Sequence, residues 1–155
     1  MTLGPLNTLR ISGEISTDDI IPAHWKHRLS DPAELSKHIF ENRFPDLRGR
    51  ISGPSLLVND AVFGIGSSRE QAVTSLLSAG IVAVIAPAFG RIFFRNSWNL
   101  GLAAIEAKAD FIAEGDATTI NFDTSRITCH AGDTSFASIP EELIAMRNHG
   151  GLLSY

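Results

Sequence analysis

Apolar runs separated by helical stretches in the middle of the chain predict a sheet crossed by helices. Three short runs have the composition of buried strands: Ser55–Val58, Ile81–Ala86 and Ala103–Ile105. Continuous apolar runs are typical of strands that are covered on both faces. Two helices are expected between them, Ser68–Ala79 and Arg91–Leu100, each followed by a glycine that would end it. This alternating order favours a parallel sheet with helical crossovers.

The N-terminal third has weaker signals. Leu9–Ser12 is expected as a short strand that ends in a polar turn, Gly13–Asp19. The sequence Asp31-Pro32-Ala33-Glu34 predicts a helix start, with a capping aspartate and a proline at the first helical position. We expect this helix to continue to about Asn42.

The C-terminal third changes character. Three short β-type runs are separated by polar turns and predict a small antiparallel meander: Thr118–Phe122, Arg126–His130 and Ser135–Ser138. A last helix is expected to open at Ser138-Ile139-Pro140-Glu141 and to end at Gly150-Gly151. The fold class is therefore α/β, with a mostly parallel central sheet and an antiparallel C-terminal flank.

Composition narrows the possible partners. With 155 residues, 44% of them hydrophobic, and no linker-like segment, residues 1–155 are expected to form a single domain. A net charge of -4 argues against nucleic acid and anionic membranes, which need clustered lysine and arginine. No secretion signal or membrane-spanning run is evident, so a cytoplasmic location is expected. Cys129 is the only cysteine, which excludes an internal disulfide and a self-contained iron–sulfur cluster.

The glycine-rich segment from Gly64 to Glu70 is the sharpest candidate site. Its glycines allow a tight turn close to a ligand, and the following helix N-terminus favours an anion. Arg69 stands where the helix dipole disfavours a cation, which hints at binding of a carboxylate. A capping box formed by Ser67 and Glu70 would equally explain serine before a helix. The segment fits neither a dinucleotide fingerprint nor a Walker loop.

Other polar residues have two interpretations each. Asp18 and Asp19 could line a site or satisfy the backbone of a turn. Arg91 opens a helix directly after a strand, where open α/β sheets bind ligands. His24 and His27 could bind a metal, but no third ligand is apparent, so we expect no metal site here. Cys129, in a predicted strand, is expected simply to be packed. The remaining residues of interest on the second central helix are Arg95, interpreted as solvated, and Asn96.

Three ordered motifs match the pattern of one known family. Gly66-Ser67-Ser68-Arg69-Glu70 resembles the Gly-Ser-Ser-Arg-Glu signature of that family. The segment from Ser16 to Ala23 is similar to its Asp-Thr-Asp-x-Ile-Ile-Pro-Ala opening. The segment from Ala86 to Asn96, followed by Asn99-Leu100-Gly101-Leu102, is similar to its Phe-Ala-Arg-Ile-Phe block. Together these motifs resemble the small subunits of 3-isopropylmalate dehydratases and, more broadly, the swivel domain of the aconitase family. The resemblance spans nearly the whole chain and implies a β/β/α swivel domain.

The resemblance also implies a role for each matching residue. Ser67 would be the general base that removes the proton alpha to a substrate carboxylate. Ser68 would stabilise the developing anion, and Arg69 would bind a substrate carboxylate. Asp18 would line the same cleft from the other loop. Residues with a substrate-binding or supporting role would be Gly66, Arg69, Arg91 and Asn96.

The implied enzyme is a hydro-lyase that needs a second protein. A separate large subunit would hold a [4Fe–4S] cluster, whose iron would act on the leaving hydroxyl of a small di- or tricarboxylate. This chain departs from the pattern after Ala23, where the family commonly has Tyr-Leu and this chain has His24-Trp25-Lys26-His27-Arg28-Leu29. We expect His24 and Trp25 to contact the substrate. The basic loop leaves open another substrate, such as homoaconitate or a substituted malate. A separate alternative is a non-catalytic binding module on the same scaffold.

Overall fold

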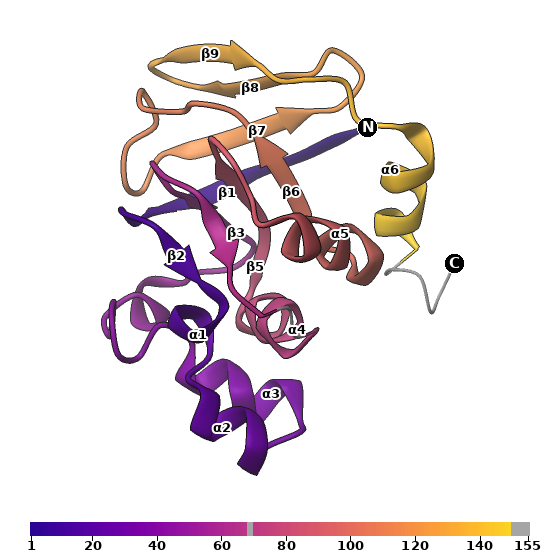
Figure 1. The fold of residues 1–155 in the computed structure, drawn as a ribbon. Helices are drawn as coiled ribbons and strands as arrows, with labels where there is room; N and C mark the ends of the chain where they lie inside the picture. Colours follow the sequence, from indigo (N-terminus) through magenta and orange to yellow (C-terminus); the bar gives the residue numbers. More distant parts are fainter. Residues whose placement is uncertain (68–69, 150–155) are drawn as a thin grey trace.

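One mixed sheet of seven strands forms the centre of the molecule, in the order β6-β5-β3-β1-β7-β8-β9 (Figure 1). The computed structural model describes residues 1–67 and 70–149. The four parallel strands are β1 (Thr2–Arg10), β3 (Ser55–Val58), β5 (Ile81–Ala86) and β6 (Ala103–Glu106). The antiparallel strands are β7 (Ala117–Asn121), β8 (Arg126–Cys129) and β9 (Gly132–Ser135). The predicted combination of a parallel centre with an antiparallel C-terminal flank is confirmed.

Two very short strands form a second, parallel pair: β2 (Ile15–Ser16) and β4 (Phe63–Ile65). From the sequence, both segments were expected to belong to turns. Strands of two or three residues are too short to show an alternating pattern, so only the tertiary pairing reveals them. This pair matters because it joins the two candidate loops.

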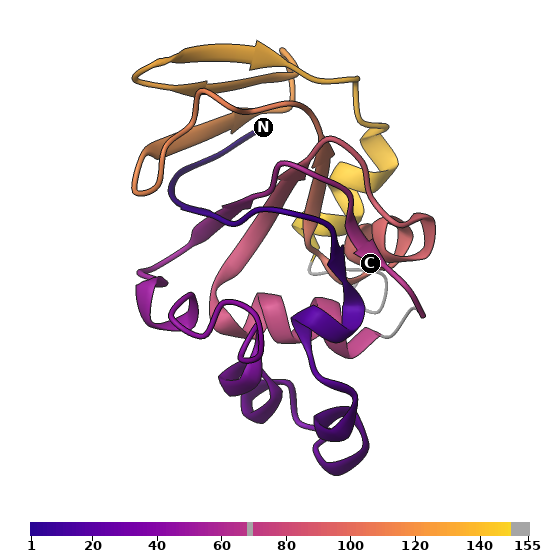
Figure 2. The ribbon, with the colours of Figure 1, turned by 60° about the vertical axis from the view of Figure 1, so that its left-hand side comes forward.

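Helices cover the sheet and extend from one end of it. The helices are α1 (Thr17–Ile20), α2 (Ala23–Arg28), α3 (Pro32–Leu35), α4 (Glu70–Ala79), α5 (Arg91–Leu100) and α6 (Glu141–Asn148), with 3₁₀ turns η1 (Ser36–His38) and η2 (Arg48–Arg50). Helices α1, α2 and α3 lie together at one end of the molecule, and strands β7, β8 and β9 lie at the other (Figures 1 and 2). None of the helices in the described part of the chain is long and apolar enough to cross a membrane.

Two apolar cores hold this arrangement. Leu9, Leu57 and Val84 occupy neighbouring positions on three parallel strands and pack with the N-terminal helices and α4. The second core contains Trp98 of α5 and Ile127 of β8, and residues of α6 pack against it. Burial of apolar side chains on both sides explains why the central strands read as continuous apolar runs.

The predicted helix from Asp31 to Asn42 is wrong beyond its first turns. Asp31 caps the helix as expected, accepting from the backbone N–H of Ala33 at 3.1 Å. The chain passes through η1 and then leaves the helical conformation, because Phe40 adopts a φ of 55° and its N–H donates to the carbonyl of Ile20 at 2.9 Å. Phe40 is fully buried. Packing of this ring overrides the local helical preference.

Among the other bounds, two differ most from the expected ones. Strand β1 begins at Thr2 rather than Leu9, with a bulge between Leu3 and Leu6 that accommodates the Gly-Pro pair. Strand β9 ends at Ser135, where the sequence pattern placed the start of a strand. The expected C-terminal end of α6, Gly150-Gly151, lies outside the described residues.

Candidate functional site

The two loops with candidate chemistry lie side by side. Strands β2 and β4 are parallel, so the segments that leave their carboxyl ends emerge at the same edge. The hydroxyl of Thr17, directly after β2, donates a hydrogen bond to the backbone carbonyl of Ser67, two residues after β4, at 2.7 Å. Thr17 is buried, whereas Ser67 is exposed. This contact joins segments that are fifty residues apart in sequence.

The first loop separates the roles of its two aspartates. The Asp19 carboxylate accepts from the backbone N–H of Ser16 at 2.8 Å, and the Asp19 N–H donates to the Ser16 hydroxyl at 3.1 Å. This is a capping box at the start of α1. Asp19 also forms an ion pair with Arg43 at 3.0 Å. Asp19 therefore has the structural role, and Asp18 is left exposed at the loop surface.

Asp18 is held by a buried lysine. The Lys26 Nζ lies 3.0 Å from an Asp18 carboxylate oxygen, with 0% of the Lys26 side chain exposed against 65% for Asp18. The ammonium comes from α2, eight residues further along the chain. A charged group is rarely fully buried unless it is paired. The pair therefore fixes the exposed Asp18 carboxylate against a buried positive charge.

The second loop depends on two glycines. Gly64 and Gly66 have φ values of 86° and 98°, in the left-handed region that favours glycine. A Cβ on Gly64 would lie 2.4 Å from the Phe93 ring, and one on Gly90 would lie 2.2 Å from the Gly64 carbonyl oxygen. Backbone therefore packs directly on backbone where β4 passes the start of α5. The close approach fixes the exit direction of the chain toward Ser67.

The remaining residues of this motif, Ser68 and Arg69, lie outside the described residues. Helix α4 follows at Glu70, so the expected helix after the glycine turn is confirmed from that residue onward. The roles expected for Ser68 and Arg69 stay predictions.

Arg91 and Asn96 lie on α5, whose start is anchored to the second loop. The N–H of Gly90 donates to the Phe63 carbonyl at 2.9 Å, and the N–H of Phe63 donates to the Ala88 carbonyl at 3.0 Å. Arg91 is exposed and Asn96 is half-buried. The expected position of Arg91 near a strand end is consistent with this anchoring.

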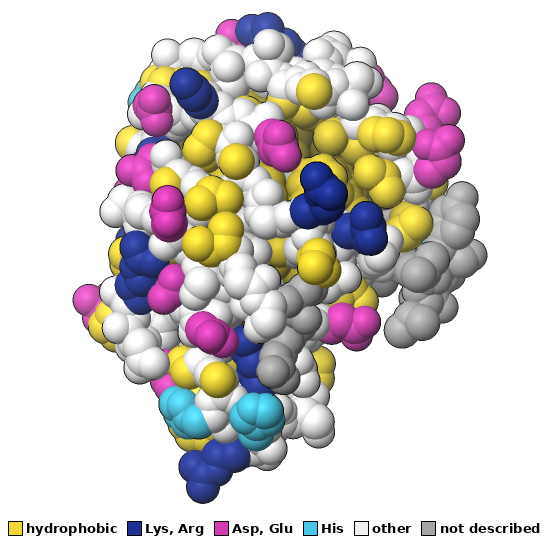
Figure 3. All heavy atoms as spheres, in the orientation of Figure 1, with side chains coloured by type: hydrophobic (Ala, Val, Ile, Leu, Met, Phe, Trp, Pro, Cys, Tyr) yellow, Lys and Arg dark blue, Asp and Glu magenta, His cyan; other side chains and the backbone are white. Residues whose placement is uncertain are grey.

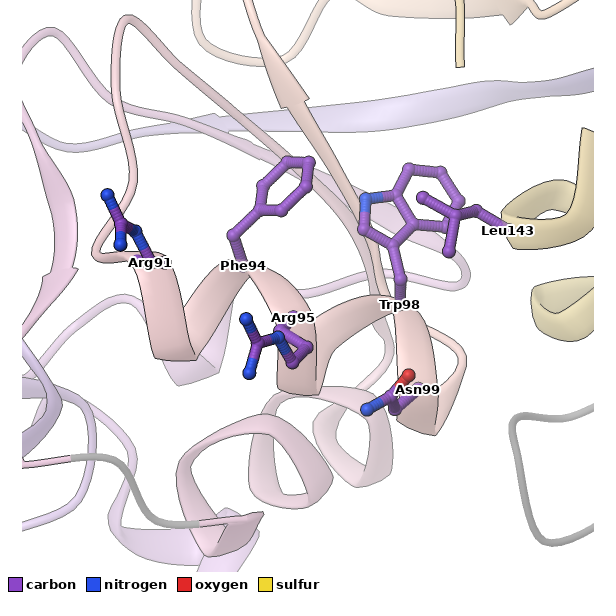
Figure 4. A pocket seen from close by; sticks show the side chains of 6 residues that line it. All are labelled: Arg91, Phe94, Arg95, Trp98, Asn99 and Leu143. Atoms are coloured by element: carbon purple, nitrogen blue, oxygen red, sulfur yellow. The ribbon is translucent and has the colours of Figure 1, made fainter. Parts of the chain in front are cut away.

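An apolar pocket of about 230 Å³ lies along α5 on the side that faces α6. It is lined by Arg91, Phe94, Arg95, Trp98, Asn99 and Leu143 (Figure 4). Hydrophobic side chains surround two cationic ones on this face of the molecule (Figure 3). Arg91 lines this pocket but Asn96 does not, so the pocket does not bring these two predicted supporting residues into one site.

The segment after Ala23, which differs from the family pattern, forms helix α2, and neighbouring side chains hold Trp25 in place. The Trp25 indole stacks on His38 with ring centroids 3.8 Å apart, and its N–H donates to a carboxylate oxygen of Glu41. His38 contacts the other Glu41 oxygen at 2.7 Å. Burial alone would raise the pKa of Glu41, but hydrogen bonds from His38 and Trp25 and the charges of His38 and His24 lower it overall.

Only part of α2 remains available to a ligand. His24 is exposed, and its ring centroid lies 4.8 Å from that of Trp25, which is half-buried. Histidine and cationic side chains gather at the tip of the molecule over this helix (Figure 3). No group of three metal-ligating side chains includes His24 or His27 in residues 1–67 and 70–149. Substrate contact by His24 and Trp25 stays a prediction.

Two residues that position the site were not singled out from the sequence. Thr17 and Lys26 were read only as members of a motif and of a basic loop. A buried hydroxyl within a motif carries no separate signal, and lysine is ordinarily expected at the surface. The separation of Asp18 and Lys26 in sequence would have suggested their pairing only if α1 and α2 had been predicted.

Known proteins match most of the length of this chain. A family model described as the aconitase C-terminal domain matches residues 14–110. A 3-isopropylmalate dehydratase small subunit of Nautilia profundicola is 40% identical over 151 residues, covering 94% of this chain and 89% of that protein. The 3-isopropylmalate dehydratase small subunit 2 of Archaeoglobus fulgidus is 36% identical over 148 residues, covering 94% and 90%.

A solved structure supports the same assignment. The crystal structure of a 3-isopropylmalate dehydratase (LeuD) from Methanocaldococcus jannaschii has a TM-score of 0.90 and 32% identity, covering 100% of this chain and 93% of that chain. The sequence matches and the structural match therefore both extend over nearly the full length of the chain. The chain belongs to the family of the aconitase C-terminal domain, together with proteins named 3-isopropylmalate dehydratase small subunit.

Proposed function

We propose that this chain is the small subunit of a 3-isopropylmalate dehydratase, which interconverts 2- and 3-isopropylmalate by dehydration and rehydration in leucine biosynthesis. The observation that carries the proposal is the hydrogen bond between Thr17 and Ser67, which brings two motif loops together with Ser67 exposed. Relatives with that name cover about nine tenths of this chain and of their own length.

The proposed mechanism assigns proton transfer to the Ser67 hydroxyl. The base would be the Ser67 alkoxide, formed when the hydroxyl loses its proton, and it would be converted back to the hydroxyl by the proton taken from the substrate. Serine is a very weak acid, so the alkoxide forms only where the surrounding groups stabilise negative charge. Ser68 and the N-terminal end of α4 would supply hydrogen-bond donors, and Arg69 would bind a substrate carboxylate. Asp18, fixed by Lys26, would contact the substrate from the opposite loop. Arg91 and Asn96 would support the site from α5.

The iron–sulfur cluster of the family does not fit this chain. Such a cluster needs three or four thiolates, and the chain has one cysteine, Cys129, buried on β8 in the antiparallel part of the sheet. We therefore propose that a separate large subunit holds the [4Fe–4S] cluster. The exposure of Ser67 and Asp18 agrees with a site that a second protein covers.

A second candidate keeps the chemistry and changes the substrate to a more polar one. The exposed tip of α2 favours it, because the Arg28 guanidinium and the polar rings of His24 and His27 lie on its surface. Lys26 does not contribute, because its charge is buried against Asp18. A neutral isopropyl group offers nothing for such a tip to bind, whereas an additional carboxylate would.

Reconstitution with the iron–sulfur large subunit tests the proposal. Each protein is assayed alone and as the pair with 3-isopropylmalate, homoaconitate and malates with small substituents. We expect activity only from the pair, with the highest kcat/KM for isopropylmalate. Turnover by this chain alone would contradict the shared site, and a higher kcat/KM for a tricarboxylate would favour the second candidate.

A further inference from the structure

Three side chains of different chemistry converge at the end of the antiparallel flank. Ligand atoms of Asp116, Cys129 and His130 all lie within 4.8 Å of one another, the only such group of three in the described part of the chain. Asp116 directly precedes β7, Cys129 ends β8, and His130 lies in the turn before β9. The group belongs to strands other than those that carry Ser67 and Asp18, so it is independent of the proposed dehydratase site.

The backbone holds Asp116 in place. Its carbonyl accepts from the N–H of Thr8 at 3.1 Å, and its N–H donates to the carbonyl of Ala113 at 3.1 Å. The Asp116 Oδ2 accepts from the Ala113 N–H at 2.8 Å, while Oδ1 lies 3.5 Å from the His130 Nδ1. One carboxylate oxygen is therefore oriented by a backbone donor, and the other faces the imidazole. Hydrogen bonds of this kind orient the carboxylate ligands of metal sites.

The β8–β9 hairpin presents the other two side chains. Thr119 pairs with Thr128 across β7 and β8, and continuing this antiparallel register places Cys129 opposite Thr118. Cys129 is 8% exposed, whereas the His130 side chain is 77% exposed. The thiol is therefore held within the sheet, whereas the exposed imidazole has room to adopt another rotamer.

We propose that Asp116, Cys129 and His130 bind one divalent metal ion of zinc-like preference. A thiolate, an imidazole and a carboxylate with an open fourth position for water are a ligand set typical of zinc. Bond lengths of about 2.0–2.3 Å place the ligand atoms of a tetrahedral site roughly 3.3–3.8 Å apart. The 3.5 Å between Asp116 Oδ1 and His130 Nδ1 is already in this range. The largest separation, at most 4.8 Å, exceeds it by about an ångström, and small side-chain rotations, above all of the exposed His130, can close that difference. On binding, the metal replaces the thiol proton of Cys129, which is released to solvent.

Cobalt(II) titration of the full-length chain under reducing conditions tests this site. Cobalt reports thiolate coordination by a near-ultraviolet charge-transfer band and tetrahedral geometry by strong visible bands. We expect the signal to saturate at one cobalt per chain and to disappear when zinc is added. Cys129→Ser should remove the charge-transfer band, and Asp116→Asn and His130→Asn should each weaken binding at least tenfold. His27→Asn, an exposed histidine on α2, should bind cobalt as the unaltered chain does.

The wild-type chain alone can overturn the proposal, so the test does not depend on the variants folding. Absence of a thiolate band, or a signal that grows without saturating at one equivalent, would exclude the site. A zinc-dependent rise in the melting temperature of the wild-type chain that is equal in Cys129→Ser would place the metal elsewhere. Circular dichroism spectra of the variants show whether lost binding follows from lost structure. Retention of full affinity by folded Asp116→Asn and His130→Asn would also contradict the proposal.

Discussion

Replacing Asp18 with asparagine should destabilise the fold, because it leaves the buried Lys26 ammonium without a counter-charge. The two charges are 3.0 Å apart, which corresponds to a gross attraction of about 5–6 kcal/mol at an effective dielectric constant near 20 and about 1.4 kcal/mol in water. Breaking a fully buried pair costs about 3–5 kcal/mol, and an exposed pair contributes about 0–1 kcal/mol. Asp18 is 65% exposed, so screening places the expected loss between these limits, at about 2 kcal/mol.

Lys26→Met provides the matched second variant. Methionine fills much of the same volume and removes the buried charge, so we expect a change in the free energy of unfolding of less than about 1 kcal/mol. The double variant should be about as stable as Lys26→Met, because Asp18→Asn then leaves no charge unpaired. The coupling free energy of the cycle should be about 2 kcal/mol.

Urea unfolding of the four proteins, followed by circular dichroism in one buffer, measures the cycle. Additive effects, with Asp18→Asn costing less than about 0.5 kcal/mol, would refute the reasoning that Lys26 is buried and charged. The same proteins separate stability from function in the reconstituted enzyme. If Asp18 contacts substrate, the stable double variant should still have reduced turnover.

Three further predictions follow from contacts in the site. Thr17→Val removes the hydrogen bond to the Ser67 carbonyl. It should lower kcat of the reconstituted pair about tenfold with little change in the free energy of unfolding, and an unchanged kcat would mean that this contact does not position the loop. Gly90→Ala places a Cβ 2.2 Å from backbone and should lower the midpoint of urea unfolding, and an unchanged midpoint would contradict the close packing. Because the pKa of Glu41 is lowered in the folded protein, the ionised carboxylate stabilises the fold above the ordinary pKa of 4.5, and this stabilisation is lost as pH falls through the lowered pKa. Glu41→Gln should therefore lose less free energy of unfolding than the wild type between pH 6 and pH 3. Equal losses in the two proteins would contradict this prediction.

The central sheet and helices α4 and α5 could be predicted because they bury long, regular patterns. Ile81–Ala86 is apolar throughout because both faces of β5 are covered. Gly101 ends α5 in the left-handed conformation, as its position after the helix indicated. These elements follow from local composition, and the tertiary structure agrees with it.

The N-terminal half of the site could not be predicted to the same extent. Helix α1 has four residues and strand β2 has two, so neither has the length for a periodic signal. Lys26 appeared to belong to a basic, solvent-facing loop, yet burial of its ammonium against Asp18 withdraws it from any ligand. Trp25 likewise is engaged by His38 and Glu41. The motif therefore predicts the site residues, while the contacts that orient Thr17, Asp18 and Trp25 depend on the tertiary fold.

Turnover by the reconstituted pair carrying Ser67→Ala tests the central claim most directly. Ser78→Ala, an exposed serine on α4, is the matched control. The account predicts that kcat for Ser67→Ala falls about 10²–10⁴-fold, the range for loss of a general base, while the pair still assembles and Ser78→Ala remains fully active. Equal turnover by the two variants would contradict proton abstraction by Ser67 and would favour a non-catalytic role for this chain.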